Sequence, residues 1–187
     1  SDLATEHREA IETVARTLAE PDAAINKLSG TRFDAEFFLS GGESSSNVYQ
    51  SPRTAIHGMV CTVRSGKLEE VLRGSLLEIT FDGAEKPQVC APLGDFFGTA
   101  PGINAYASLA SGAMEDGVLY ARWVMPFKEQ VEVRVRNLSS TNFYATIEVY
   151  CKKYEWTKNS MYFHSGFRSE HPIKTHPRQD WNFLDTT

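Results

Sequence analysis

Residues 94–98, Gly-Asp-Phe-Phe-Gly, place a carboxylate beside two aromatic rings with a glycine on each side. A carboxylate accepts hydrogen bonds from sugar hydroxyls, and aromatic faces pack against apolar sugar faces, so this segment is a candidate carbohydrate site around Asp95 and Phe96. The structural alternative is a tight loop whose phenylalanines belong to the core while Asp95 hydrogen-bonds nearby amides. An expected strand, Leu76–Phe81, and a turn at residues 82–83 (Asp-Gly) lead into the segment.

Residues 162–170, Tyr-Phe-His-Ser-Gly-Phe-Arg-Ser-Glu, form a second segment dense in chemically useful side chains. A strand is expected over Met161–His164, which brings His164, Arg168 and Glu170 together at a strand end, where binding loops occur. An imidazole can donate to or accept from a hydroxyl, and a guanidinium can orient a carboxylate. The alternative is a surface ion pair between Arg168 and Glu170, with a hydrogen-bonded histidine in the core.

A third candidate is the expected strand Leu119–Val124. Alternation along this strand directs Tyr120 and Arg122 to one face and Ala121 and Trp123 to the other. Either face is a candidate pocket wall, and the alternative is one core face and one solvated face.

Several chemistries find no support in the sequence. The spacing of the last three histidines matches no metal-ligand pattern, and no Gly-x-Ser-x-Gly, P-loop or dinucleotide-binding motif occurs. Glycoside hydrolysis requires two carboxylates at a defined separation, and the sequence does not place any two acidic residues in that way. We therefore expect no metal and no cofactor, and we assign no catalytic residue within this chain.

Composition narrows the function classes further. The 187 residues carry a net charge of −5, with acidic and basic residues intermixed, which argues against a nucleic-acid partner or a polybasic membrane surface. No apolar run reaches the length of a membrane span. The three cysteines form no CxxC pair, and reduced, buried thiols are expected at Cys90 and Cys151, which lie in strand-like apolar contexts. A cytoplasmic and a periplasmic location both remain open.

The chain divides near residue 30. Residues 1–29 lack aromatic side chains and carry a helical stripe of Ile11, Val14 and Leu18, which predicts an α-helix ending by Glu20. A short second helix is expected over Asp22–Leu28. The stripe indicates either a helix that packs over a sheet or a helix that mediates oligomerisation.

Residues 30–187 read as one β domain with short strands. Besides those named above, strands are expected over Arg32–Leu39, Ile56–Val63, Val131–Arg136 and Phe143–Cys151, with a flexible loop over residues 41–46. The last two strands are expected to pair as an antiparallel hairpin with one solvated face. The pattern predicts a mainly β protein: an antiparallel jelly-roll sandwich with an N-terminal α-helix.

Five segments together resemble glycoside hydrolase family 172. They are Leu-Arg-Gly-Ser-Leu-Leu-Glu-Ile-Thr-Phe-Asp-Gly at 72–83, Pro-Leu-Gly-Asp-Phe-Phe-Gly at 92–98, Met-Pro-Phe at 125–127, the 162–170 segment, and Asp-Trp-Asn-Phe-Leu-Asp at 180–185. The resemblance spans roughly residues 70–185. It implies a double jelly roll, trimers or dimers of trimers, and retaining hydrolysis or transfer of α-linked furanosides such as fructofuranosides or D-arabinofuranosides.

The resemblance also implies roles for individual residues. Asp95 is expected to contact sugar hydroxyls, Phe96 or Trp123 to provide an apolar platform, and His164 with Arg168 to orient the substrate or a catalytic carboxylate. The family's catalytic glutamates lie in Gly-Glu-Gly-Asp and Gly-Thr-Glu-Asp segments, and neither segment occurs in this chain. We therefore expect this chain to be the N-terminal half of such an enzyme. The partner of this chain is then a C-terminal half of the same protein or a second chain. Without that partner, this chain should bind little and hydrolyse nothing. The alternative is a non-catalytic jelly-roll module for carbohydrate binding or assembly.

Overall fold

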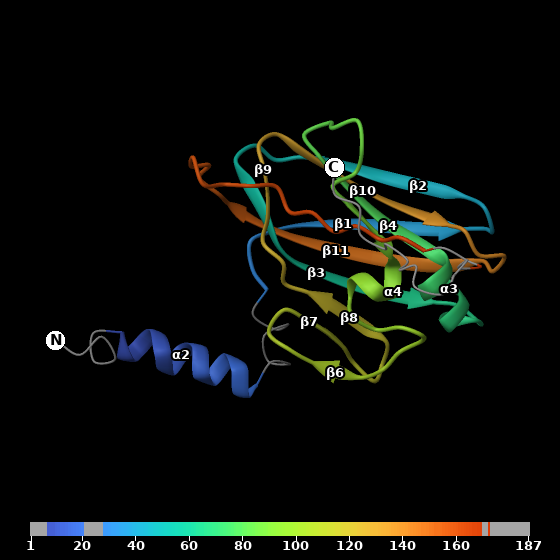
Figure 1. The fold of residues 1–187 in the computed structure, drawn as a ribbon, viewed down its shortest axis with the longest axis horizontal. Coiled ribbons are helices and arrows are strands. Elements are labelled where there is room, and N and C mark those ends of the chain that lie inside the picture. The colour runs from blue at the N-terminus through green and yellow to red at the C-terminus, as the bar shows by residue number, and fades with distance from the viewer. Residues whose placement is uncertain (1–6, 21–27, 170–171, 173–187) are drawn as a thin grey trace, which may run out of the picture.

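The computed structural model describes residues 7–20, 28–169 and 172. Two antiparallel β-sheets pack face to face as a sandwich, and the N-terminal helix α2 (Arg8–Ala19) projects away from it (Figure 1). The predicted fold class, a mainly β antiparallel sandwich with an N-terminal helix, is confirmed. The division of the chain into residues 1–29 and 30–187 stays a prediction.

The larger sheet has the strand order β1-β11-β3-β8-β7-β6, with β9 also paired to β3, and the smaller sheet has the order β2-β10-β4-β5. The strands of the larger sheet are β1 (Thr31–Leu39), β3 (Thr54–Arg64), β6 (Tyr106–Ala107), β7 (Ser111–Ala113), β8 (Val118–Ala121), β9 (Met125–Phe127) and β11 (Phe143–Lys153). Those of the smaller sheet are β2 (Ser44–Gln50), β4 (Ser75–Phe81), β5 (Val89–Pro92) and β10 (Gln130–Asn137). Two short helices, α3 (Leu68–Gly74) and α4 (Leu93–Phe96), flank β4 and β5.

The core lies between the two sheets and is built by alternation along the strands. In β10, Val131, Val133 and Val135 are fully buried, and in β11 the inward-facing positions include Ile147 and Val149, which are also fully buried. Because alternate side chains point to opposite faces, β10 and β11 each give one apolar face to the core and a more exposed face to the outside. Five of the expected strands match β1, β3, β4, β10 and β11 to within two residues at each end.

The expected hairpin between Val131–Arg136 and Phe143–Cys151 is wrong. β10 pairs with β2 and β4, whereas β11 pairs with β1 and β3, so the chain crosses from one sheet to the other between them. Alternation shows that each strand buries one face. It does not show whether two such strands lie side by side or face each other across the core.

The flexible loop expected over residues 41–46 is also wrong in part. From Ser44 onward the chain forms β2, an edge strand paired with β10 over its whole length. Most side chains of β2 are exposed, so the strand lacks an apolar period that the sequence could reveal, and its backbone hydrogen bonds to β10 hold it in place.

The N-terminal helix ends at Ala19, as the proline at position 21 predicts. Its stripe is not packed over the sheet of this chain, because Ile11, Val14 and Leu18 are each more than half exposed. The helix carries an unburied apolar face in the described part of the structure. Most of the expected second helix, Asp22–Leu28, falls outside the described residues.

Two further strand expectations need correction. Leu119–Val124 is a strand only through Ala121, and Met161–His164 is extended without being a strand. The second segment meets β5 at a single bridge, where Ser165 pairs with Val89 in parallel. Two backbone hydrogen bonds at Ser165, together with side-chain contacts, hold it against the sandwich.

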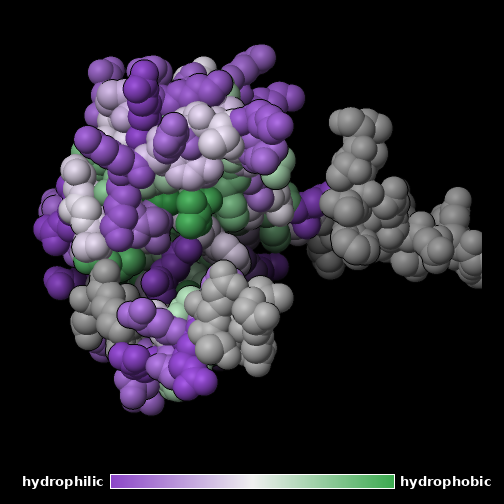
Figure 2. Space-filling model, turned by 90° about the vertical axis from the view of Figure 1, so that its left-hand side faces the viewer, coloured by the Kyte–Doolittle hydropathy of each residue, from purple (hydrophilic) through white to green (hydrophobic). Residues whose placement is uncertain are grey.

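The surface of the sandwich is mainly polar. Figure 2 shows this for the side toward which α2 projects, where hydrophilic side chains surround a hydrophobic area near the middle. In the described part of the chain, no helix has the length and hydropathy needed to cross a bilayer. The three cysteines are free, and burial raises the pKa of Cys61 and of Cys151 to about 12.

Candidate functional site

Helix α4 places Asp95 and Phe96 at one edge of the sandwich. It begins directly after β5, because Pro92 ends that strand with φ −53° and ψ 140° and the next four residues turn helically. The turn closes when the N–H groups of Gly98 and Thr99 donate to the carbonyls of Asp95 (3.0 Å) and Gly94 (2.9 Å). The loop expected at residues 94–98 is therefore a single helical turn that fixes the direction of the Asp95 side chain.

A cavity of about 290 Å³ lies next to this turn, between Trp123, two residues after β8, and the extended segment 163–167. We call it the Trp123 cavity. Its lining consists of Ala91, Pro92, Asp95, Phe96, Trp123, Phe163, Ser165, Gly166 and Phe167. The volume is close to the lower end of the roughly 300–1,000 Å³ range of small-molecule sites.

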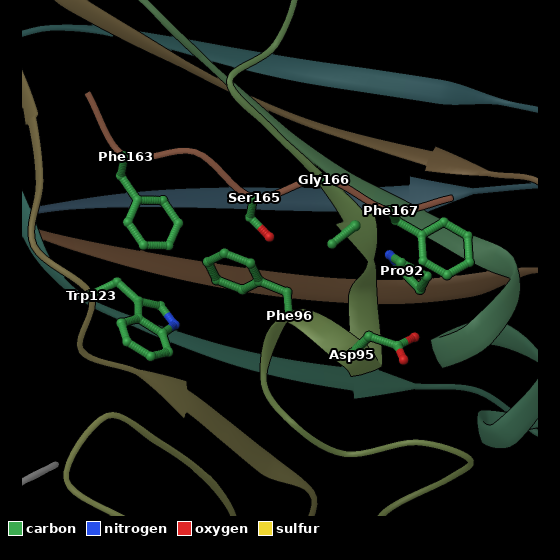
Figure 3. Close-up of a pocket in the computed structure, with 9 residues that line it drawn as sticks. Pro92, Asp95, Phe96, Trp123, Phe163, Ser165, Gly166 and Phe167 are labelled. Carbon is green, nitrogen blue, oxygen red and sulfur yellow. The ribbon is translucent and has the colours of Figure 1, made fainter. Parts of the chain in front are cut away.

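Four of the nine lining residues are aromatic (Figure 3). Trp123 and Phe163 stack with ring centroids 5.9 Å apart and an interplanar angle of 28°, and they form one end. Phe96 lies between this pair and the opposite end, where Phe167 and Asp95 are found. The edge of the Phe96 ring faces its neighbour Phe97, which is fully buried in the core.

The Asp95 carboxylate is anchored by a cation. The Arg73 guanidinium, from the last turn of α3, donates a hydrogen bond to Asp95 Oδ1 and also lies 5.4 Å above the Phe167 ring. Asp95 Oδ2 is buried without a hydrogen-bond partner. One carboxylate oxygen is thus satisfied by the protein and the other is not, which is unusual for a buried polar atom.

The segment 163–167 is fixed by its middle residue. Ser165 N–H donates to the Gln88 carbonyl (3.0 Å), and the Cys90 N–H donates to the Ser165 carbonyl (2.8 Å). The side chains of Phe163, Ser165 and Phe167 line the same cavity, as alternation in an extended segment requires.

The structure brings together three of the five candidate residues, Asp95, Phe96 and Trp123. His164 and Arg168 are exposed and do not line the cavity, because they lie between and beyond the inward-facing residues of the segment. Glu170 lies outside the described residues. Sequence reasoning missed Arg73, Phe163 and Phe167. The Phe-x-Ser-x-Phe alternation at 163–167 was an available sequence signal for Phe163 and Phe167. Arg73 lies 22 positions before Asp95, and no sequence pattern connects the two residues.

The chemical capacity of the cavity follows from its lining. Asp95 is the only acidic side chain among the lining residues in the described structure, so the pair of carboxylates that glycoside hydrolysis uses is not complete there. Nor do any three His, Cys, Asp or Glu side chains in residues 7–20, 28–169 and 172 lie close enough together to hold a metal ion. The arrangement suits binding of a small, hydroxyl-rich molecule with apolar faces.

Comparison with known proteins now decides the family. The model of the family described as GH172 domain-like matches residues 31–149, well over half of the chain. The chain belongs to the GH172 domain-like family. The matched region includes β1, α4 and Trp123, and it ends before the segment 163–167 of this GH172 domain-like chain.

Other comparisons add little. No curated protein matches the GH172 domain-like chain. Among solved structures, PliG of Aeromonas hydrophila, a periplasmic lysozyme inhibitor of g-type lysozyme, matches 65% of this chain and 85% of its own, with 11% identity and a TM-score of 0.31. We draw no conclusion from a likeness at this level.

The close approach at Gly94 gives a first prediction. A Cβ at this position would lie 2.4 Å from the Thr99 carbonyl oxygen and 3.0 Å from Leu72 Cβ. Thr99 is fully buried and its hydroxyl is held by hydrogen bonds to the backbone of residues 102 and 104, so it cannot yield easily. Gly94→Ala should lower the free energy of unfolding by about 2 kcal/mol, measured by urea denaturation.

The matched control is Gly66→Ala, because a Cβ at Gly66 meets nothing within 4 Å. It should change the free energy of unfolding by less than about 0.5 kcal/mol. Equal effects of the two substitutions would show that the packing at Gly94 is not as described.

Proposed function

We propose that this chain is the N-terminal part of a retaining glycoside hydrolase or transferase that acts on α-linked furanosides, such as fructofuranosides or D-arabinofuranosides. The observation that carries the proposal is the Trp123 cavity, in which aromatic rings and one anchored carboxylate meet within a GH172 domain-like chain. Aromatic faces accept the C–H-rich side of a sugar, and a carboxylate distinguishes its hydroxyls.

Each lining residue has a defined part in the proposal. Trp123 stacked on Phe163 provides the apolar platform, with Phe96 beside it, and Asp95 accepts hydrogen bonds from sugar hydroxyls. Arg73 holds Asp95 in place through one of its five N–H groups, so several donors stay available at the cavity edge. A flat furanose ring is small enough for a cavity of this volume.

The catalytic carboxylates belong, in this proposal, to a C-terminal half of the same protein or to a second chain. His164 and Arg168 face away from the cavity lining and are exposed, so we propose that they contact that second half and orient its carboxylate. Assembly as a trimer or hexamer is part of the same proposal. It is supported by the exposed apolar stripe of Ile11, Val14 and Leu18 on α2.

The test is Asp95→Asn in the full-length protein. Loss of a charged hydrogen-bond acceptor should lower kcat/KM for a p-nitrophenyl α-furanoside by about 10-fold to 100-fold, because a hydrogen bond to a charged group contributes roughly 1.5–3 kcal/mol. The thermal midpoint should change little, since asparagine has nearly the same shape and still accepts a hydrogen bond from Arg73.

Asp116→Asn is the matched control. Asp116 is an exposed residue whose carboxylate accepts a hydrogen bond from the Val118 N–H (3.2 Å) and does not line the cavity. Its substitution should leave kcat/KM unchanged. If Asp95→Asn leaves turnover intact, or unfolds the protein, Asp95 has only a structural role.

A second candidate function is a non-catalytic module that binds carbohydrate or mediates assembly. The observation that favours it is the single acidic side chain in the lining of the Trp123 cavity. A full-length protein that binds a methyl α-furanoside, loses that binding in Trp123→Ala, and never turns the furanoside over would support this alternative.

A further inference from the structure

Asp82 occupies a turn that is built around its carboxylate. The residue follows β4 and has a left-handed backbone with φ 54°, and Gly83 after it has φ 67°. Oδ1 accepts hydrogen bonds from the backbone N–H groups of Glu129 (2.7 Å) and Gln130 (3.1 Å), and Oδ2 accepts one from Lys128 (2.9 Å). The carboxylate therefore joins the end of β4 to the start of β10.

One further donor reaches Asp82 from a distant part of the chain. The Tyr162 hydroxyl donates to Asp82 Oδ2 at 2.7 Å. The Tyr162 ring stacks on Phe81 (centroids 6.0 Å apart, 17°) and lies 5.1 Å from the Trp156 ring. Lys128 Nζ lies 5.2 Å from the centroid of the Trp156 ring and is the outermost member of this cluster of side chains.

This contact immediately precedes the segment 163–167, which we call the wall segment of the Trp123 cavity. In the described structure, residues 155–164 make no backbone hydrogen bond to a strand. Their side-chain hydrogen bonds to the rest of the sandwich are that of Tyr162 to Asp82 and that of Trp156 Nε1 to the Phe127 carbonyl (3.2 Å). The Tyr162 hydroxyl is thus the polar anchor nearest to Phe163.

We propose that the Asp82–Tyr162 hydrogen bond is a latch that positions the wall segment, and with it Phe163 and Ser165, at the Trp123 cavity. Asp82 and Tyr162 are positioning residues, since neither lines the cavity. The consequence for sugar turnover rests on the proposed function, whereas the effect of the latch on the wall segment does not.

The protonation states suit a latch that stays closed at neutral pH. Burial pushes the pKa of Asp82 upward, but the hydrogen bonds from Lys128, Glu129, Tyr162 and Gln130 outweigh it, and the pKa lies below its ordinary value. Burial and the hydrogen bond to Asp82 raise the pKa of Tyr162 to about 12. An ionised acceptor and a neutral donor therefore coexist at neutral pH.

The test is Tyr162→Phe, which removes the hydroxyl and keeps the ring between Phe81 and Trp156. Amide-resolved hydrogen exchange by NMR should show about tenfold faster exchange at Ser165 and Cys90, whose N–H groups make the two bonds between the wall segment and the edge of the small sheet. Exchange at Val133 in β10 should not change, which shows that the sandwich is intact. In the full-length protein, kcat/KM for a p-nitrophenyl α-furanoside should fall about tenfold.

Tyr154→Phe is the matched control, because the Tyr154 hydroxyl contacts the Ser160 hydroxyl (3.2 Å), in the stretch that precedes the wall segment, and not a strand of the sandwich. It should leave both readouts unchanged. Equal exchange at Ser165 and Cys90 in Tyr162→Phe and wild type would overturn the latch. Faster exchange with unaltered turnover of a furanoside would overturn its link to the cavity. A wild-type protein that turns over no furanoside would count against the proposed function alone, since exchange is measured without a ligand.

Discussion

Asn137→Ala should lower the free energy of unfolding by about 3 kcal/mol. Asn137 is fully buried at the point where the chain crosses between the sheets. Its Nδ2 donates to the carbonyls of Ser40 (3.0 Å) and Thr141 (2.9 Å), and its Oδ1 accepts from the N–H (3.0 Å) and hydroxyl (2.7 Å) of Ser139. Alanine would remove this partner from several partly buried backbone groups, and a buried group left unsatisfied costs roughly 1–3 kcal/mol.

Chemical denaturation of Asn137→Ala and Asn142→Ala side by side measures this effect. Asn142 belongs to the same crossover but is exposed, so its substitution should change the free energy of unfolding by less than about 0.5 kcal/mol. A loss below about 1 kcal/mol for Asn137→Ala would contradict the role of this side chain in the crossover.

Trp123→Ala should lower kcat/KM of the full-length protein for an α-furanoside by up to about 100-fold. Covering roughly 100 Å² of apolar ring with a sugar contributes about 2.5 kcal/mol, which is nearly two factors of ten. Trp123 is 36% exposed in the structure, so its ring has an open face for such a contact. Trp123→Phe should retain part of the activity, because a smaller aromatic face remains against Phe163.

Phe38→Ala is the control for Trp123→Ala. Phe38 is a 74% exposed aromatic residue on β1, an edge strand that β11 and β3 separate from β8 in the large sheet. Its loss should leave kcat/KM unchanged in the Trp123 assay. If both substitutions reduce turnover equally, the effect is not specific to the cavity and the platform role of Trp123 is refuted.

The strands that bury one face were predictable, because alternating apolar and polar residues in the sequence indicate directly which side chains are buried. This alternation correctly predicts β10 and β11, but the expected hairpin between them is wrong. The two strands lie in different sheets, and the chain crosses the sandwich after Asn137. β2 could not be found in this way. Its serine-rich, exposed side chains carry no apolar period, and only its backbone pairing with β10 defines it as a strand.

The part of the candidate site that is formed by residues adjacent in sequence was predictable. Asp95 and Phe96 follow from one segment, and their place in the cavity comes from a helical turn that the two flanking glycines permit. Arg73 was not predictable, because it reaches Asp95 from α3. Phe163 had a signal in the alternation of residues 163–167, but its stack on Trp123 had none. Their contacts depend on tertiary packing between residues far apart in sequence.

The most direct test of the account is an assay of furanoside turnover by two samples, the 187-residue chain alone and the full-length protein of the proposal, which adds the C-terminal half. We expect the full-length protein to hydrolyse p-nitrophenyl α-D-arabinofuranoside or the corresponding α-D-fructofuranoside, with retention at the anomeric carbon by NMR and no action on the matching pyranosides. The 187-residue chain alone should be inactive. Turnover by the short chain alone, or a full-length protein that neither binds nor cleaves an α-furanoside, would contradict the account.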